Sequence, residues 1–200
     1  MRPVPCPRTM KRPLFAAFLT IALALPPLPA RTQSGLVEVP LGFCSLSSMS
    51  AATLINTTTC SVAAFTGTGS GTNLTASAVT GPIVAGTQVA GTGVPSGTYI
   101  VSQKSGTPFG AGVYNTSVPT TASSASLTTG GIPVGANYAV ICAYTQAVNY
   151  RDDGGVPTGT AGSGGQGIAA GQCIPYNGTF SLLQFIQQTS GAILGISFYR

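Results

Sequence analysis

The chain has 200 residues, of which 8 are lysine or arginine and 3 are aspartate or glutamate, and it contains no histidine. A Ser-His-Asp triad, a Cys-His pair and a histidine-ligated metal site are therefore excluded. The only side-chain carboxylates are those of Glu38, Asp152 and Asp153, so the composition points away from catalysis and predicts a protein that is not an enzyme.

The first 30 residues have the parts of a secretory signal peptide. Four basic residues up to Arg12 precede an apolar run over 14–25, and Ala30 offers a small residue for cleavage. The run spans 12 positions, fewer than the roughly 18 that indicate a membrane span; an uncleaved anchor or a buried helix is the alternative. We expect a signal helix that starts at Met1 or Met10. The mature chain is then exported to the periplasm, the cell surface or the medium, without a stable membrane span.

Removal of this segment leaves four basic residues against three acidic residues, a net charge of +1. No lysine or arginine cluster remains, so a nucleic-acid partner, which needs many phosphate contacts, is not expected. The chain is 44% hydrophobic, unlike disordered chains, which combine low hydrophobicity with high charge. It can therefore bury a core, and the scarcity of charged side chains at strand edges favours self-association into a homo-oligomer.

Short runs of Val, Ile, Thr, Tyr and Phe between clusters of Gly, Pro, Asn and Ser are typical of an all-β chain. The expected strands, in chain order, are 41–47, 73–79, 98–103, 113–118, 125–128, 138–148, 171–176, 182–187 and 192–199. Turn chemistry adds a type I turn over 94–97. It also predicts a type I′ hairpin at Asn177 and Gly178, because both residue types tolerate positive φ.

Composition divides the mature sequence into a middle and two flanks. Residues 65–129 consist mainly of Gly, Thr, Ser, Ala and Val, contain no cysteine and hold one charged residue, Lys104. Insertions are tolerated at surface loops whose two ends lie close together. We therefore predict a discontinuous β-sandwich over 31–64 and 130–200, jelly-roll-like or immunoglobulin-like, split by a small inserted β module over 65–129.

The mature flanks contain Cys44, Cys60, Cys142 and Cys173, and an even number of cysteines in an exported chain indicates two disulfides. Four cysteines allow three pairings. Local loop closure favours Cys44 with Cys60 and Cys142 with Cys173. A zinc site is the alternative, although the chain has no Cys-x-x-Cys pair.

Arg151, Asp152 and Asp153 form the one charge cluster of the mature sequence. The two carboxylates make it a candidate ligand or Ca²⁺ contact, although calcium takes six to eight oxygen ligands. The alternative is a turn in which aspartate side chains accept hydrogen bonds from nearby backbone N–H groups, with Arg151 paired beside them. We favour the turn and expect neither a metal nor a cofactor.

Tyr138, Tyr144 and Tyr150 follow one another at intervals of six residues, an even spacing that places side chains on one face of a continuous strand. Aromatic rings on a sandwich face can stack against sugars, so these tyrosines are candidate glycan contacts; packing in the core or at an edge is the alternative. The glycine-rich segment 159–167 lacks the Gly-Lys-Ser/Thr of a phosphate-binding loop and is expected to be a flexible exposed loop.

Two stretches resemble small β-sandwich proteins encoded in the structural gene regions of tailed phages and prophages: 146–154, which ends in Tyr-Arg-Asp-Asp-Gly, and 196–200. Residues 40–43 would be the opening strand of that family. The middle is similar, through 71–75 and 89–94, to a Gly/Thr-rich module inserted in phage and bacterial surface proteins. The resemblance implies a structural or binding role through contacts with a protein assembly or a surface glycan. The alternative that it implies is a head-decoration or tail protein of a virion.

Overall fold

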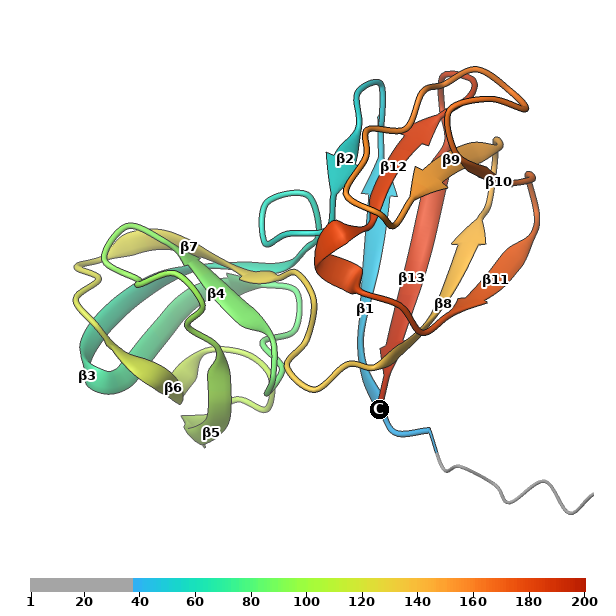
Figure 1. Cartoon of the computed structure of the whole chain (residues 1–200). Coiled ribbons are helices and arrows are strands. Elements are labelled where there is room, and N and C mark those ends of the chain that lie inside the picture. Colours follow the sequence, from blue (N-terminus) through green and yellow to red (C-terminus); the bar gives the residue numbers. More distant parts are fainter. Residues whose placement is uncertain (1–37) are drawn as a thin grey trace, which may run out of the picture. The chain divides into compact units, whose positions relative to one another are not determined.

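The computed structural model describes residues 38–200, which form strands and one short 3₁₀ turn, η1 (Phe180–Leu182). Every strand pairing is antiparallel. The predicted all-β sandwich is confirmed, because two four-stranded sheets pack against each other around a hydrophobic core (Figure 1). The predicted signal peptide lies outside the described residues.

The sandwich consists of two sheets, which we call sheet A and sheet B. Sheet A has the order β1 (Pro40–Ser47), β13 (Ile193–Tyr199), β8 (Tyr138–Ala143) and β11 (Cys173–Tyr176). Sheet B has the order β10 (Gln166–Ile168), β9 (Val148–Arg151), β12 (Gln184–Gln187) and β2 (Thr53–Leu54). Side chains alternate between the two faces of a strand, so Leu194, Ile196 and Phe198 of β13 are buried in the core.

The predicted strand over 138–148 is wrong in its continuity. β8 ends at Ala143 in sheet A, and β9 begins at Val148 in sheet B. The break occurs where the chain passes from one layer of the sandwich to the other. β8 pairs with β13 and β11 in sheet A, whereas β9 pairs with β12 and β10 in sheet B.

The segment between the two parts of the sandwich forms a third sheet, sheet C. Its strand order is β4 (Gln88–Gly91), β7 (Ala125–Gly130), β3 (Ser61–Thr80), β6 (Gly112–Thr120) and β5 (Ile100–Gly106). β3 is 20 residues long and pairs with β7 through its first part and with β6 through its second part. The first residue of the second part, Gly71, has φ +60°, a value that glycine adopts without steric cost.

Sheet C closes on itself. A bridge joins Gln88 of β4 to Tyr99, the residue before β5, and Val89 N–H donates to Thr98 O over 2.8 Å. The closed sheet surrounds its own hydrophobic cluster, which includes Leu74, Tyr114 and Leu127 and shares no residue with the sandwich core. Closure leaves few free strand edges in this part of the chain.

The two ends of sheet C meet where the chain leaves and re-enters the sandwich. Gly131 N–H donates to Cys60 O over 3.0 Å, and Ser61 is opposite Gly130 in the β3–β7 register. Sheet C therefore runs from Ser61 to Gly130, whereas the sequence places the inserted module over 65–129. Ends that meet in this way satisfy the physical condition for an insertion into a loop.

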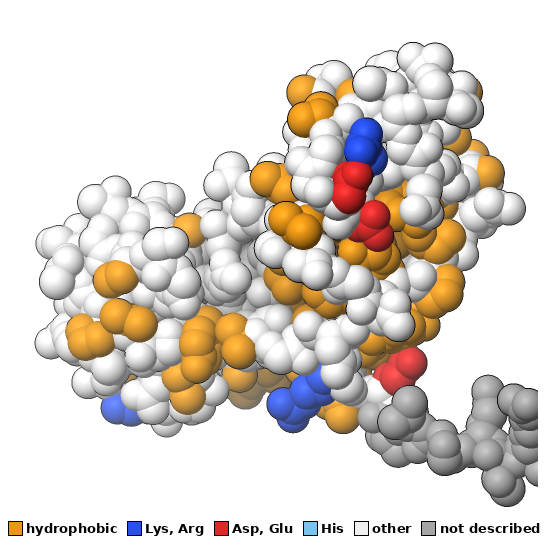
Figure 2. Space-filling view, in the orientation of Figure 1, with side chains coloured by type: hydrophobic (Ala, Val, Ile, Leu, Met, Phe, Trp, Pro, Cys, Tyr) orange, Lys and Arg blue, Asp and Glu red, His pale blue; other side chains and the backbone are white. Residues whose placement is uncertain are grey.

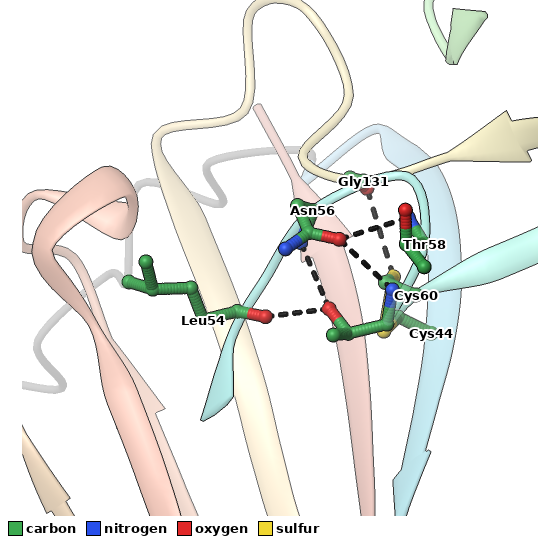
Figure 3. The surroundings of a disulfide bond; sticks show 7 residues. Cys44, Leu54, Asn56, Thr58, Cys60 and Gly131 are labelled. Atoms are coloured by element: carbon green, nitrogen blue, oxygen red, sulfur yellow. Dashed lines mark hydrogen bonds between the residues drawn. A yellow bond between two sulfur atoms is a disulfide. The ribbon is translucent and has the colours of Figure 1, made fainter. Parts of the chain in front are cut away.

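Two disulfides join Cys44 to Cys60, with Cα atoms 5.3 Å apart, and Cys142 to Cys173, with Cα atoms 4.0 Å apart. The predicted pairing is confirmed. The first disulfide is buried at the base of sheet C, where Asn56 Oδ1 accepts hydrogen bonds from the N–H groups of Thr58 and Thr59 (Figure 3). Cys60 Sγ lies 3.8 Å from Gly131 O; a disulfide sulfur carries no hydrogen, so this approach is a packing contact.

Both turn predictions are wrong in detail. Asn177 and Gly178 do not join a hairpin, because β11 pairs with β8 and the chain enters η1 at Phe180; neither residue has positive φ. The other turn is one residue later than expected. Thr98 N–H donates to Pro95 O over 3.2 Å, and Gly97 has φ +79°, the value that a type II turn needs at its third position.

Candidate functional site

The Arg151–Asp153 segment is a surface turn. The Arg151 guanidinium donates to both carboxylate oxygens of Asp153, over 3.0 Å and 2.5 Å, and Gly155 N–H donates to Asp153 Oδ1 over 2.9 Å. These donors hold the pKa of the Asp153 carboxyl well below its usual range, the Arg151 hydrogen bonds being the largest cause. Both side chains are substantially exposed, 39% and 58%, and an ion pair this exposed contributes little to stability.

Asp152 is exposed beside the same turn. Its charge adds to the effect of burial in raising the phenol pKa values of Tyr150 and Tyr176. A shallow depression of about 170 Å³ is lined by the turn, Gly165 and Gln166. Within residues 38–200 no group of three or more His, Cys, Asp or Glu side chains is placed to hold a metal ion.

Tyr150 belongs to the sandwich core. It is 8% exposed, its ring centroid lies 6.2 Å from that of Phe185, and its hydroxyl donates to Gln166 Oε1 over 2.7 Å. The interpretation that Tyr138, Tyr144 and Tyr150 share one face is therefore wrong. The strand break places Tyr150 in sheet B, while the other two tyrosines accompany sheet A.

A buried amide organises the glycine-rich loop, which the sequence predicts to be flexible and exposed. Asn149 is 1% exposed and donates through Nδ2 to Thr158 O over 2.7 Å, to Thr160 O over 2.9 Å and to Ser163 O over 3.4 Å. Its Oδ1 accepts from Gln188 Nε2 over 2.7 Å. Asn149 therefore ties three backbone carbonyls of the loop to sheet B, a role that sequence reasoning missed.

Two of the candidate tyrosines lie on the outer face of sheet A, the face that points away from the sandwich core. Strand alternation and register define this face. It comprises Phe43, Ser45 and Ser47 of β1, Ile193, Gly195, Ser197 and Tyr199 of β13, Tyr138, Val140 and Cys142 of β8 with Tyr144 beyond its end, and Cys173 and Pro175 of β11. None of these residues is charged.

The aromatic side chains of the outer face are accessible. Tyr144 is 54% exposed and Phe43 is 50% exposed. Tyr138 is opposite Tyr199 in the register, and their ring centroids lie 5.9 Å apart with a tilt of 51°. Ser45, Ser47 and Ser197 add hydroxyl groups to the same face.

Gly195 allows the Tyr144 ring to lie over β13. A Cβ atom placed on Gly195 would lie 2.6 Å from both Cε2 and the hydroxyl oxygen of Tyr144, closer than any side chain tolerates. The ring thus occupies the space that a larger residue would take. Phe43, Gly195 and Ser197 carry no recognisable signal in the sequence, because only the pairing of distant strands brings them beside the tyrosines.

An apolar cavity of about 290 Å³ adjoins the outer face at Phe43. Its lining includes Val62, Pro82, Val84 and Pro133. Charged groups are few on the face drawn in Figure 2, where basic and acidic groups lie side by side on the sandwich and the others are scattered among uncharged side chains. The described surface therefore offers apolar, aromatic and hydroxyl groups in place of charge.

No family model, curated protein or solved structure matches this chain. None of the helical segments in residues 38–200 is long and apolar enough to cross a membrane. The two disulfides are compatible with an exported protein.

Proposed function

We propose that this protein is exported and acts without catalysis, as a structural or binding protein of phage-like origin. The outer face of sheet A makes its contacts, with a protein assembly or with a surface glycan. One observation carries the proposal: uncharged aromatic and serine side chains stand together on a rigid four-stranded sheet that a disulfide crosses. Exposed aromatic groups that gather on one face mark interaction sites in proteins.

The distribution of titratable groups supports the non-catalytic part of the proposal. Asp153 is committed to Arg151 and to the Gly155 N–H group, and Asp152 lies beside core tyrosines rather than opposite a second free carboxylate. The outer face itself contains hydroxyl groups and a disulfide but no Asp, Glu, His or Lys side chain to serve as an acid or base. General acid–base catalysis needs such a group within hydrogen-bond reach of the substrate.

Export is tested by the intact mass and N-terminal sequence of the protein recovered from cells, periplasm, medium and virions, with and without reductant. A chain that begins near Arg31 and gains four hydrogens on reduction supports the proposal. A full-length, reduced chain in the cytoplasm contradicts it.

The alternative function is a virion-associated head-decoration or tail protein of a prophage. The phage-like stretches at 146–154 and 196–200 favour it; in the structure they form β9 with its turn and the end of β13. Recovery of the chain from purified virions, together with capsid and tail proteins, would make this alternative the leading one.

A further inference from the structure

We infer that the outer face of sheet A binds a neutral polysaccharide, with Tyr144 and Phe43 as the stacking platforms. This inference rests on the proposed function, which leaves the partner open between an assembly and a glycan. The size of the face, its lack of charge and the way in which its rings are held support a glycan.

The size of the face favours a ligand over a protein partner. Four strands about 4.8 Å apart and rows that extend about 20 Å along them give an area of roughly 400 Å². A stable protein interface buries about 800 Å² on each partner. This flat area is smaller than the footprint of a standard protein interface, and it is large enough for a short run of sugar rings.

The charge of the face selects a neutral ligand. None of its residues is charged, and the Arg151–Asp153 pair, which neutralises itself, lies on sheet B. Glu38 precedes β1 and Arg200 follows β13, so the charges at that end of sheet A are opposite. An anionic polysaccharide would find no cation on the face itself. Sugar C–H groups are instead attracted to the negative faces of aromatic rings, and the serine and tyrosine hydroxyls can both donate to and accept from sugar hydroxyls.

The placement of the rings favours a chain of sugars over a single one. The Tyr144 ring covers Gly195, and Tyr199 lies four residues further along the same strand, about 13 Å away at the rise of an antiparallel strand. Phe43, opposite Ser197 in the register, lies between these two ends. A ligand that contacts all three must extend over more than one sugar ring.

Gly195 provides a variant that moves a ring without removing it. In Gly195→Ala the new Cβ atom would occupy the position of the Tyr144 ring, so the ring must swing away from β13. The ring is more than half exposed, so it can do so without disturbing the core. Phe109→Ala serves as the matched control, because Phe109 is equally accessible, 59% exposed, but follows β5 in sheet C.

The test is affinity gel electrophoresis of the secreted chain in gels that contain dextran, hydroxyethyl cellulose or glucomannan, with anionic alginate as the charged comparison. We expect at least one neutral polysaccharide to retard the protein. Tyr144→Ala should weaken that binding about tenfold, Gly195→Ala at least threefold, and Phe109→Ala not at all. Intact mass and near-ultraviolet circular dichroism show that each variant keeps its disulfides and its fold.

The inference would be overturned by retardation by alginate alone, by no retardation in any gel, or by retardation that the Tyr144 and Gly195 variants leave unchanged. Sedimentation of the same proteins tests whether a second copy of the chain occupies the face instead. Self-association that Tyr144→Ala abolishes would show that a second copy of the chain occupies the face. That result would refute the glycan and leave the proposed surface-contact function standing, whereas a cytoplasmic reduced chain would refute the function itself.

Discussion

Replacement of Asn149 by alanine should destabilise the sandwich and free the loop that follows β9. The side chain is 1% exposed and makes three hydrogen bonds of 2.9 Å or shorter, to Thr158 O, Thr160 O and Gln188 Nε2. A hydrogen bond contributes about 0.5–1.5 kcal/mol net, and a buried group left unsatisfied costs more. The expected loss is therefore about 2–4 kcal/mol, a large share of the roughly 5–15 kcal/mol that stabilises a typical domain.

Urea unfolding measures this loss. The chain has no tryptophan, so far-ultraviolet circular dichroism or tyrosine fluorescence should report the transition. An unchanged slope with a lower midpoint identifies a change in stability. Elastase, which accepts small residues, should cleave the 154–165 loop of Asn149→Ala faster than that of the wild type.

Asn115→Ala is the matched control, because Asn115 is only half-buried and its Nδ2 donates one long hydrogen bond, 3.3 Å, to Ser102 Oγ. It should lose less than about 1 kcal/mol. Asn149→Asp keeps the shape but points a carboxylate at backbone carbonyls, which raises the pKa of the new carboxyl. Its destabilisation should therefore be greatest at neutral pH and shrink as the pH falls. The reasoning is refuted if Asn149→Ala matches the control in both assays.

Three further results are expected. Mild reductant should open the Cys142–Cys173 disulfide of the native protein first, as alkylation and mass spectrometry would show. Both of its cysteines belong to the solvent-facing side of sheet A, whereas Cys44 and Cys60 are 2% and 0% exposed. Simultaneous opening of the two disulfides would contradict this. Leu127→Ala should lower the free energy of unfolding by about 2–5 kcal/mol and affect sheet C alone, since its cluster shares no residue with the sandwich core. Calorimetry of the variant should then show two unfolding transitions in place of one. A uniform shift of a single transition would mean that the two parts unfold together. Burial raises the phenol pKa values of Tyr150 and Tyr176 above 10.0, so these phenols ionise at lower pH in the unfolded chain than in the folded one. The free energy of unfolding should therefore fall as the pH rises above about 10. Urea unfolding at a series of alkaline pH values would measure this fall.

The sequence predicts those strands that alternate clearly or that end at strong turn residues. β1, β7 and β13 lie within a residue or two of the expected positions. β2, β4 and β10 were missed because two to four residues are too few to show a period. The early part of β3 was missed because glycine and threonine are frequent in it, and Gly71, whose φ is +60°, separates it from the predicted strand over 73–79.

The candidate site shows where sequence reasoning stops. The Arg151–Asp153 turn is visible because charge is so rare in this chain, and the pairing of its side chains follows from their proximity. The outer face of sheet A is assembled from β1, β8, β11 and β13, which lie far apart in the sequence, so register alone brings Phe43, Gly195 and Tyr144 onto one face. The six-residue spacing predicts that Tyr144 and Tyr150 share one face. That prediction is wrong because the residue pattern does not show where the chain passes from sheet A to sheet B.

The scarcity of charge has a consequence for how any ligand binds. Ion pairs at an interface weaken as salt is added, since the Debye length falls from about 10 Å at 0.1 M to about 3 Å at 1 M. The outer face has no charged residue to screen, so its affinity for a neutral polysaccharide should change less than twofold between 0.05 M and 1 M sodium chloride. Affinity electrophoresis repeated over this range measures the effect. A steep loss of binding with salt would instead place the contact at Arg151, Lys104 or Arg200, outside the face, and the Tyr144 and Gly195 variants would then bind as well as the wild type.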